Sequence, residues 1–248
     1  MTNEKRYRVG VDIGGTFTDI VLLGDDGVFY TKKTPSTPTD YSDGIINGLF
    51  EVLCEHNISP KQIDDVVHAT TVATNAILEN KGAKTGLITT AGFRDVLEFR
   101  RIRIPVMYDL TWEKPKALVP RRLRLEVSER LAPDGSVWRA LDDQSVREAA
   151  ERLSQAKVES VAICLLHSYA NPTHELRVAE LVRSILPSST YITCSHQIMS
   201  QAREYERTST TVVNALLGPI ISRYLDELNT SLTNKGIMRP VQVMQSGG

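Results

Sequence analysis

The feature that most constrains the fold is a pair of glycines between two apolar runs near the start of the chain. The segment Arg8 to Leu23 reads RVGVDIGGTFTDIVLL, with alternating apolar residues before Gly14 and Gly15 and another apolar run, IVLL, after them. A period of two is typical of half-buried β-strands, and a short glycine-containing break between two such runs indicates a tight turn. The segment therefore predicts two antiparallel strands joined by a glycine turn.

The residues that follow extend this pair to a three-stranded meander. GDDG, at residues 24–27, predicts a second turn, and VFYTKK, at residues 28–33, predicts a third strand. A dinucleotide-binding fold would instead place a helix after the first strand, and the glycine segment matches neither GxxxxGK[ST] nor GxGxxG. The two commonest phosphate loops are therefore excluded.

The residues of the glycine turn suit phosphate oxygens. Gly14 and Gly15 have no side chains, so their N–H groups can approach an anion closely. Thr16 and Thr18 add hydroxyl donors, and Phe17 between them is assigned to the same turn. The sequence predicts that this turn binds the phosphates of a nucleotide. The simpler alternative is a hairpin whose glycines only satisfy turn geometry.

Two carboxylates flank the turn. Asp12, at the end of the first strand, is predicted to hold Mg²⁺ through water, because a carboxylate in direct contact with phosphate would be repelled. Asp19 is a second outer-sphere ligand or a residue that orients the turn.

Beyond the meander, strands and helices alternate, which predicts an α/β fold with a partly parallel sheet. Apolar residues at helical spacing predict a helix that begins at Thr39 or Asp40, and a long helix over 203–232. The irregular segment 94–141, with a PDGS hairpin signal, is interpreted as an extension of the sheet. The remaining predicted strands cover residues 64–70, 84–90, 158–168, 190–195 and 241–245, and the remaining helices 71–80, 142–156 and 172–186.

Composition excludes several classes of protein. The 248 residues are 41% hydrophobic and 24% charged with a net charge of −1, which gives no electrostatic reason to expect nucleic acid or an anionic membrane as partner. No apolar run approaches the ~18 residues of a membrane span. Three well-separated cysteines form no CxxC pair, so neither a disulfide framework nor a zinc cluster is indicated. A reducing, cytoplasmic location is expected.

Isolated cysteines and histidines receive structural interpretations. Cys54 and Cys164 lie in apolar runs and are expected in the core. His167, His174 and His196 are too far apart in sequence to indicate a metal site, and each is expected to be structural.

A second polar group lies where a predicted strand passes into a helix, in HATTVATNAILE. The first N–H groups of a helix have no intrahelical partner and favour anions. Thr70, Thr71 and Asn75 are therefore candidates for an oxyanion cradle that would hold a γ-phosphate or a substrate carbonyl. The alternative is a set of threonines that only cap the helix.

Arginines are frequent in FRDVLEFRRIR. Arg100 and Arg103 are candidates for substrate contact, because a guanidinium matches carboxylate or phosphate oxygens, although a solvated strand face explains such runs equally well. In REYERTST, Arg203, Glu204 and Arg207 are interpreted as surface ion pairs of the long helix.

The glycine segment also carries a family resemblance. VGVDIGGTFTDIVLL resembles the first phosphate motif of the actin, sugar-kinase and heat-shock-chaperone type of ATPase. More narrowly, it resembles the hydantoinase A/5-oxoprolinase family, which includes acetone and acetophenone carboxylase subunits. The resemblance continues through VVHATTVATNAILENKGAKTGLITTAGFRDVLEFRR, YDLTWEKPKALVPR, ERLAPDGSV, CLLHSYANPTHELR and REYERTSTTVVNA, and so covers nearly the whole chain.

The resemblance implies a ribonuclease-H-like, actin-type ATPase lobe whose mixed sheet begins with the antiparallel meander. Residues 1–200 would form the first lobe and residues 201–248 the start of a second. The family's second glycine hairpin, DMGGTSTDV, lies downstream of residue 248. The closing VMQSGG resembles VMQSNGG of the family without its asparagine, and a fragment of a longer protein is the simplest interpretation.

The resemblance also implies a function that uses ATP and Mg²⁺. An amide or enol oxygen would be phosphorylated, with Asp12, Thr71 and Asn75 as catalytic residues, and the product would then be hydrolysed or carboxylated. Cyclic amides such as hydantoins, 5-oxoproline or lactams are the leading substrates, and ketones are the alternative. A B-type hydantoinase/oxoprolinase subunit is the expected partner. A nucleotide-gated regulatory module without turnover is the rival from another class.

Overall fold

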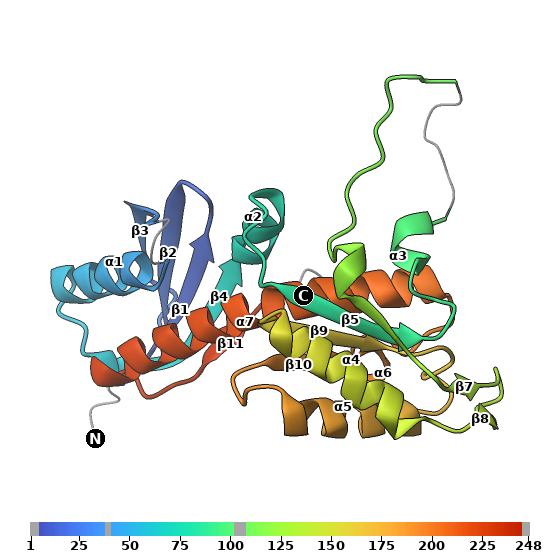
Figure 1. Cartoon of the computed structure of the whole chain (residues 1–248). Helices are drawn as coiled ribbons and strands as arrows, with labels where there is room; N and C mark the ends of the chain where they lie inside the picture. Colours follow the sequence, from blue (N-terminus) through green and yellow to red (C-terminus); the bar gives the residue numbers. More distant parts are fainter. Residues whose placement is uncertain (1–4, 38–40, 102–107, 245–248) are drawn as a thin grey trace. The chain divides into compact units, whose positions relative to one another are not determined.

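The computed structural model describes residues 5–37, 41–101 and 108–244 (Figure 1). The contacts within the chain divide it into two compact units. Unit 1 consists of residues 1–81 and 220–248, and unit 2 consists of residues 82–219. The boundary predicted at residue 200 refers to the lobes of longer family members and stays a prediction.

Unit 1 is built on a five-stranded sheet in the order β11-β4-β1-β2-β3. The strands β1, β2 and β3 form the predicted antiparallel meander, β4 runs parallel to β1, and β11 runs parallel to β4. The prediction of a mixed sheet that opens with a meander is thereby confirmed. The five strands are Tyr7–Ile13 (β1), Phe17–Gly24 (β2), Phe29–Pro35 (β3), Ile63–Thr70 (β4) and Val241–Val243 (β11).

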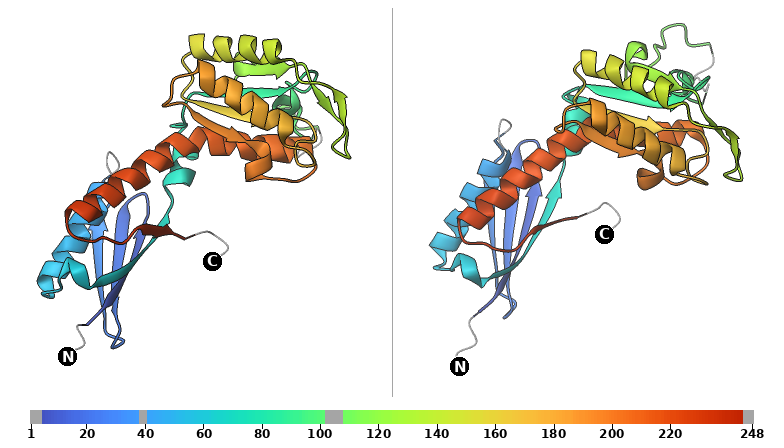
Figure 2. Two further views of the ribbon diagram at one scale, coloured as in Figure 1. Left: turned by 90° about the horizontal axis from the view of Figure 1, so that it is seen from below. Right: turned by 60° about the horizontal axis from the view of Figure 1, so that its bottom comes forward.

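The alternation in β1 and β2 separates the two faces of this sheet. One face packs against α1 (Tyr41–Glu55) and the second part of α7 (Glu204–Asn234), and both helices lie on the same side (Figure 2). The residues between the buried ones point to the other face, which carries Arg8, Asp12 and Asp19 as well as the exposed apolar Val21 and Leu23. The buried residues include Val9, Val11, Ile13, Ile20, Leu22, Ile45, Leu49, Leu53, Tyr224, Leu228 and Leu232. Cys54 corrects one prediction, because it lies on the exposed side of α1.

Unit 2 contains a four-stranded sheet in the order β10-β9-β5-β6, and every neighbouring pair is parallel. The first strand in sequence, β5, lies between β6 and β9. The chain therefore passes from β5 to a neighbour on one side, β6, and later adds β9 and β10 on the other side. Such a position is a topological switch point. The four strands are Thr85–Thr90 (β5), Arg124–Val127 (β6), Ser160–Cys164 (β9) and Tyr191–Cys194 (β10).

Strand register identifies what covers each face of this sheet. A side chain at Gly86 would collide with Leu153 of α4, so one face of β5 packs against α4. Thr89 pairs with Cys164 across β5 and β9, and Cys164 contacts Thr208 of α7, so α7 covers the other face. The remaining elements of unit 2 are α3 (Val96–Phe99), η2 (Arg121–Leu123), β7 (Arg130–Leu131), β8 (Val137–Arg139), α4 (Asp143–Gln155), α5 (Thr173–Ile185) and α6 (Ser195–Ile198).

The irregular segment 94–141 behaves as predicted in two respects. It contributes β6 to the edge of the parallel sheet, and its PDGS sequence forms the turn between β7 and β8. The prediction of one sheet for the whole chain is wrong, because the strands belong to two separate sheets in two units. None of the helices in the described part of the chain combines the length and apolar character that crossing a membrane requires.

Candidate phosphate-binding turn

The glycine turn between β1 and β2 is fixed at its base by hydrogen bonds from both sides. The N–H of Gly14 donates to the carbonyl of Phe17 at 2.9 Å, which closes the hairpin. At the end of β3, the N–H of Ser36 donates to Thr16 O at 2.9 Å, and its hydroxyl donates to Gly14 O at 2.9 Å. The turn is therefore held in one conformation by the third strand of the meander.

The tip of the turn leaves backbone donors open. Gly15 and Thr16 are exposed, and within the described ranges their N–H groups donate no hydrogen bond to the chain. Neither Gly14 nor Gly15 has a positive φ, so backbone conformation does not explain the glycines. A Cβ on Gly14 would lie 3.2 Å from Phe17 O, whereas one on Gly15 would lie 3.5 Å from Asn75 Nδ2, in ordinary contact. At position 14, a side chain would be crowded by Phe17 O. At position 15 a side chain would have room, so the remaining reason for a glycine there is access of a ligand to the N–H groups.

The two carboxylates lie on the exposed face of the sheet. Asp12 and Asp19 are register partners across β1 and β2, so their side chains project to the same side. Lys33 pairs with Asp19 at 3.1 Å. Among the residues that the structure describes, the Asp12 carboxylate has no hydrogen-bond or ion-pair partner. An exposed carboxylate of this kind fits a hydrated Mg²⁺, which binds through one or two carboxylates and keeps several waters.

Thr18 differs from the expectation. The alternation of β2 turns its side chain to the helix-covered face, where it is 1% exposed. Its hydroxyl lies 3.0 Å from Ser36 Oγ. Thr18 thus supports the base of the turn through Ser36, and the direct phosphate contact predicted for it has no support from this geometry. Thr16 and Phe17 are exposed, and Lys33 Nζ lies 5.2 Å from the centroid of the Phe17 ring.

The start of α2 (Val72–Leu78) is joined to the glycine turn. Both the N–H and the hydroxyl of Thr71 donate to Ile13 O, at 3.1 and 3.0 Å, and Ile13 directly precedes Gly14. Asn75 Nδ2 donates to Thr71 Oγ1 at 3.4 Å. The structure therefore brings Thr71 and Asn75 beside the turn, as a phosphate site with both segments would require.

The oxyanion cradle predicted at this helix start has fewer open donors than expected. The N–H of Thr71 is used by Ile13, and the N–H of Val72 donates to Thr70 Oγ1 at 3.1 Å. Thr70 therefore acts as a local cap, which was the alternative interpretation. The roles of Thr70, Thr71 and Asn75 toward a ligand stay predictions.

His68, in the same segment, is a structural residue. Its ring is fully buried, with Nδ1 3.3 Å from Val11 O and Nε2 2.6 Å from the hydroxyl of Tyr224. Because a carbonyl only accepts, Nδ1 carries the proton, and Nε2 accepts from Tyr224. Burial lowers the pKa of His68, so the ring is neutral.

The arginines assigned to substrate are not joined to the turn by any described contact. Arg100 belongs to unit 2, and its Nη2 donates to Pro115 O at 3.0 Å. Arg103 lies outside the described residues. Substrate contact by either residue stays a prediction.

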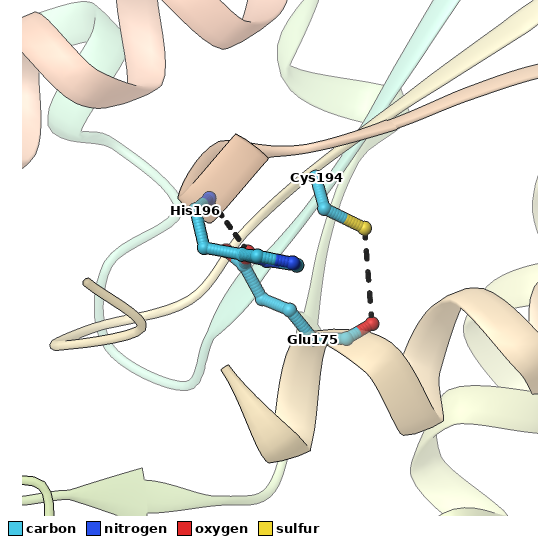
Figure 3. Close-up of side chains that lie close together, drawn as sticks. All are labelled: Glu175, Cys194 and His196. Atoms are coloured by element: carbon cyan, nitrogen blue, oxygen red, sulfur yellow. Dashed lines mark hydrogen bonds and ion pairs between the residues drawn. The ribbon is translucent and has the colours of Figure 1, made fainter. Parts of the chain in front are cut away.

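Sequence reasoning missed a buried polar cluster in unit 2. Glu175 is fully buried and accepts hydrogen bonds from Leu165 N (2.9 Å), Ser195 Oγ (2.6 Å), His196 N (3.0 Å) and His196 Nδ1 (2.6 Å). Figure 3 shows His196 beside the Glu175 carboxylate. Burial alone would raise the pKa of Glu175, but the hydrogen bonds from His196, Ser195 and Leu165 outweigh it and lower the pKa. His196 is therefore structural, as predicted.

Cys194 also lies close to this carboxylate, and its Sγ donates to Glu175 O at 3.9 Å. Ligand atoms of Glu175, Cys194 and His196 lie within 4.8 Å of one another. Burial raises the pKa of the Cys194 thiol to about 12, and the four hydrogen bonds use the lone pairs of Glu175. The group is thus a hydrogen-bonded core, in which the Glu175 carboxylate is already occupied by four donors.

A β-meander with an exposed glycine turn, a flanking carboxylate and a threonine–asparagine helix start defines a candidate phosphate-binding α/β protein. Comparison with known families identifies which one. Residues 8–186 match the hydantoinase/oxoprolinase N-terminal region, and residues 207–248 match hydantoinase/oxoprolinase. The chain belongs to the hydantoinase/oxoprolinase family.

Two relatives show how the chain compares with longer proteins. It is 38% identical to caprolactamase subunit alpha of Pseudomonas jessenii over 99% of this chain and 36% of the relative. It is 35% identical to the acetophenone carboxylase gamma subunit of Aromatoleum aromaticum, over 88% of this chain and 32% of the relative. The crystal structure of the ATP-dependent caprolactamase from Pseudomonas jessenii matches 97% of this chain and 36% of that chain, with a TM-score of 0.89 and 37% identity. The chain therefore spans about a third of the length of these relatives.

Proposed function

We propose that the glycine turn binds the phosphates of ATP and that this chain takes part in the ATP-dependent activation of a carbonyl oxygen. The observation that carries the proposal is the pair of open N–H groups at Gly15 and Thr16, beside the unpartnered carboxylate of Asp12. The strand order β3-β2-β1-β4-β11 supports assignment of unit 1 to the ribonuclease-H-like, actin-type ATPase lobe. The similarity to the ATP-dependent caprolactamase from Pseudomonas jessenii supports ATP as the nucleotide.

The reaction is a phosphoryl transfer. The carbonyl oxygen of the substrate forms a bond to the γ-phosphorus, the bond from that phosphorus to the β–γ bridging oxygen breaks, and its electron pair leaves with ADP. Phosphate is then a far better leaving group than an amide or enolate oxygen. Because such transfers depend on positioning and charge neutralisation, the N–H groups of Gly15 and Thr16 would hold the phosphate oxygens while the charge moves to ADP.

Asp12 is the residue that would hold Mg²⁺ in this site, through water. When bound, Mg²⁺ supplies charge neutralisation at the phosphate oxygens. Asn75 and Thr71 are proposed to orient the phosphate nearest the substrate, because they are linked to the turn through Ile13. Asp19, which forms an ion pair with Lys33, is proposed to orient the turn.

Cyclic amides of the lactam type are the proposed substrates, because caprolactamase subunit alpha is similar along nearly the whole chain. A ketone carboxylated through its enol phosphate is the second candidate, favoured by the similarity to the acetophenone carboxylase gamma subunit. Both relatives are named as subunits, which supports a B-type hydantoinase/oxoprolinase partner for this chain.

The proposal is tested by following the amide signals of Gly15 and Thr16 in NMR spectra while Mg-ATP is added to millimolar concentration. We expect both signals to shift saturably, and Asp12→Asn to weaken the Mg²⁺-dependent affinity about tenfold, or ~1.4 kcal/mol. Asp65→Asn is the matched control. Asp65, on β4, lies on the same face of the sheet as Asp12 but forms an ion pair with Arg8. Unshifted signals at Gly15 and Thr16, or equal losses in both variants, would contradict the proposal.

A further inference from the structure

Ser36, which directly follows β3, contacts the glycine turn through both its backbone and its side chain. Its N–H donates to Thr16 O at 2.9 Å, and its hydroxyl donates to Gly14 O at 2.9 Å. The backbone bond extends the pairing of β2 with β3 and depends on no particular side chain, because every residue except proline carries an N–H. The second bond exists only because the side chain at position 36 can donate a hydrogen bond.

The hydroxyl of Ser36 is the middle member of a chain of hydrogen bonds. A hydroxyl has one hydrogen, and Ser36 uses its hydrogen for Gly14 O. Thr18 Oγ1, which lies 3.0 Å from Ser36 Oγ, is therefore the donor to Ser36. Thr18 is 1% exposed on the helix-covered face of the sheet. The chain thus runs from Thr18 through Ser36 to the carbonyl of Gly14, and each of its bonds polarises the next.

The bond to Gly14 O also determines where the N–H of Gly15 points. The carbonyl of Gly14 and the N–H of Gly15 belong to one planar trans peptide unit, so they point in nearly opposite directions. Because Ser36 and Thr18 hold the carbonyl toward the helix-covered face, the N–H of Gly15 is directed to the exposed face. The exposed face is the one that carries the carboxylate of Asp12.

The peptide unit between Gly14 and Gly15 has little resistance of its own to turning over. Such a flip changes ψ of Gly14 and φ of Gly15, and neither residue has a Cβ that restricts these angles. Among the residues that the structure describes, the hydroxyl of Ser36 is the only donor to Gly14 O. In the flipped orientation, the carbonyl oxygen of Gly14 would face the exposed side and repel a phosphate oxygen.

We propose that Ser36 is a positioning residue for the phosphate site, an inference that rests on the proposed function of the turn. Its hydroxyl holds the peptide unit between Gly14 and Gly15 in the orientation that presents the Gly15 N–H to a phosphate oxygen. Without this hydroxyl, the peptide unit populates both orientations. The apparent affinity for Mg-ATP then falls in proportion to the fraction of molecules that keep the competent orientation.

The experiment compares Ser36→Ala with the wild-type chain. This variant removes the hydroxyl and keeps the backbone bond to Thr16 O. Without nucleotide, we expect the residual dipolar coupling of the Gly15 N–H, which reports the direction of this bond in NMR spectra, to change. The couplings of the β1 amides should stay the same, which shows that the sheet is retained. The affinity for Mg-ATP, measured by calorimetric titration, should fall about threefold to tenfold.

Three further variants separate positioning from a general effect on the fold. Ser36→Thr keeps a hydroxyl and should restore both the Gly15 coupling and the Mg-ATP affinity. Thr18→Val removes the first donor of the chain at nearly constant volume, and it should change both quantities in the same direction as Ser36→Ala but less. Thr34→Val is the matched control, because Thr34 Oγ1 is buried in unit 1 and has no hydrogen-bond partner, so both quantities should stay unchanged.

The two readouts distinguish failure of this inference from failure of the proposed function. An unchanged Gly15 coupling in Ser36→Ala, or equal Mg-ATP affinities in this variant and the wild-type chain, would overturn the role of Ser36 but not the phosphate site. Equal losses of affinity in Ser36→Thr and Ser36→Ala would also overturn it. Failure of the wild-type chain to bind Mg-ATP would refute the proposed function, and the role of Ser36 with it.

Discussion

The two units treat polar groups in opposite ways. At the glycine turn of unit 1, Asp12 and the N–H groups of Gly15 and Thr16 are exposed and make no bonds to the described chain. In unit 2, Glu175 and Arg207 are buried in a network that reaches several segments. Exposed polar groups can change without loss of the fold, whereas buried charges cannot. The comparison predicts that mutations separate into those that affect ligand binding and those that affect folding.

The largest expected effect comes from Glu175→Ala. Removal of this carboxylate leaves the donors of Ser195 and His196 unpaired and Arg207 without its indirect counter-charge. We expect the free energy of unfolding of unit 2 to fall by about 3–5 kcal/mol. Urea unfolding followed by tryptophan fluorescence measures this unit alone, because both tryptophans, Trp112 and Trp138, belong to it.

The matched change in unit 1 is Asp12→Ala. We expect it to alter the free energy of unfolding by less than about 0.5 kcal/mol, because the side chain is exposed. It should nevertheless remove the Mg²⁺ dependence of nucleotide binding. Equal stability losses in Glu175→Ala and Asp12→Ala would break the proposed contrast between the units.

The second prediction concerns a buried titratable pair in unit 1, His68 and Tyr224. Tyr224→Phe removes the donor to His68 Nε2, and we expect a loss of about 1–3 kcal/mol in the stability of unit 1. Hydrogen exchange of the β1 and β4 amides measures it, because His68 lies on β4 and its ring contacts Val11 of β1. Undiminished protection in this variant would show that the hydrogen bond contributes nothing.

His68 also makes the stability of unit 1 depend on pH. Burial lowers the pKa of His68 in the folded chain below its usual value. Below about pH 6.5 the unfolded chain binds a proton that folded His68 resists, so stability is full above this pH and falls as the pH decreases. Hydrogen exchange of the β1 amides between about pH 7 and about pH 5 tests the sign. His56→Gln is the control, because the His56 ring is exposed on the surface of unit 1. If this variant loses the pH dependence of stability, then His56 and not His68 is its source, and the prediction is wrong.

The local elements could be predicted from the sequence because each carries its own pattern. Alternating apolar residues identified β1, and its bounds at Tyr7 and Ile13 agree with the expected strand. Asp142 begins α4 as the side-chain cap of its first turn, and the break at Pro172 begins α5. The glycine turn was recognisable for the same reason, since its glycines, threonines and carboxylates are adjacent in sequence.

The division into two sheets could not be predicted in this way. Strands β4 and β11 are neighbours although more than half of the chain separates them, and no local pattern encodes that pairing. Arg207 was interpreted as a surface residue because it lies in the polar sequence REYERTST. Its burial depends on Leu165, Ser168 and Ser195, which lie 12 to 42 residues away. Thr18 was assigned to phosphate because sequence adjacency does not show which face of a strand a hydroxyl takes.

A further prediction compares the two glycines of the turn. In Gly14→Ala the new Cβ meets Phe17 O at 3.2 Å, and we expect a cost of about 1 kcal/mol in the stability of unit 1. Gly15→Ala should cost less than about 0.5 kcal/mol, because its Cβ has ordinary contacts. Gly15→Val should leave the fold intact and weaken Mg-ATP binding, because a branched side chain then covers the open N–H groups. Unchanged nucleotide affinity in Gly15→Val would refute the placement of phosphate at this turn.

The smallest expected effect belongs to the ion pair beside the turn. Lys33 and Asp19 are both more than half exposed, so Lys33→Met should change the stability of unit 1 by no more than about 1 kcal/mol. The methionine also retains apolar contact with Phe17, so packing on this face is preserved. Lys33 contributes a positive charge close to the turn, and its removal should weaken Mg-ATP binding less at high salt than at low salt. Calorimetric titration at two ionic strengths measures the difference. A loss of affinity that is the same at both ionic strengths would contradict a long-range electrostatic role for Lys33.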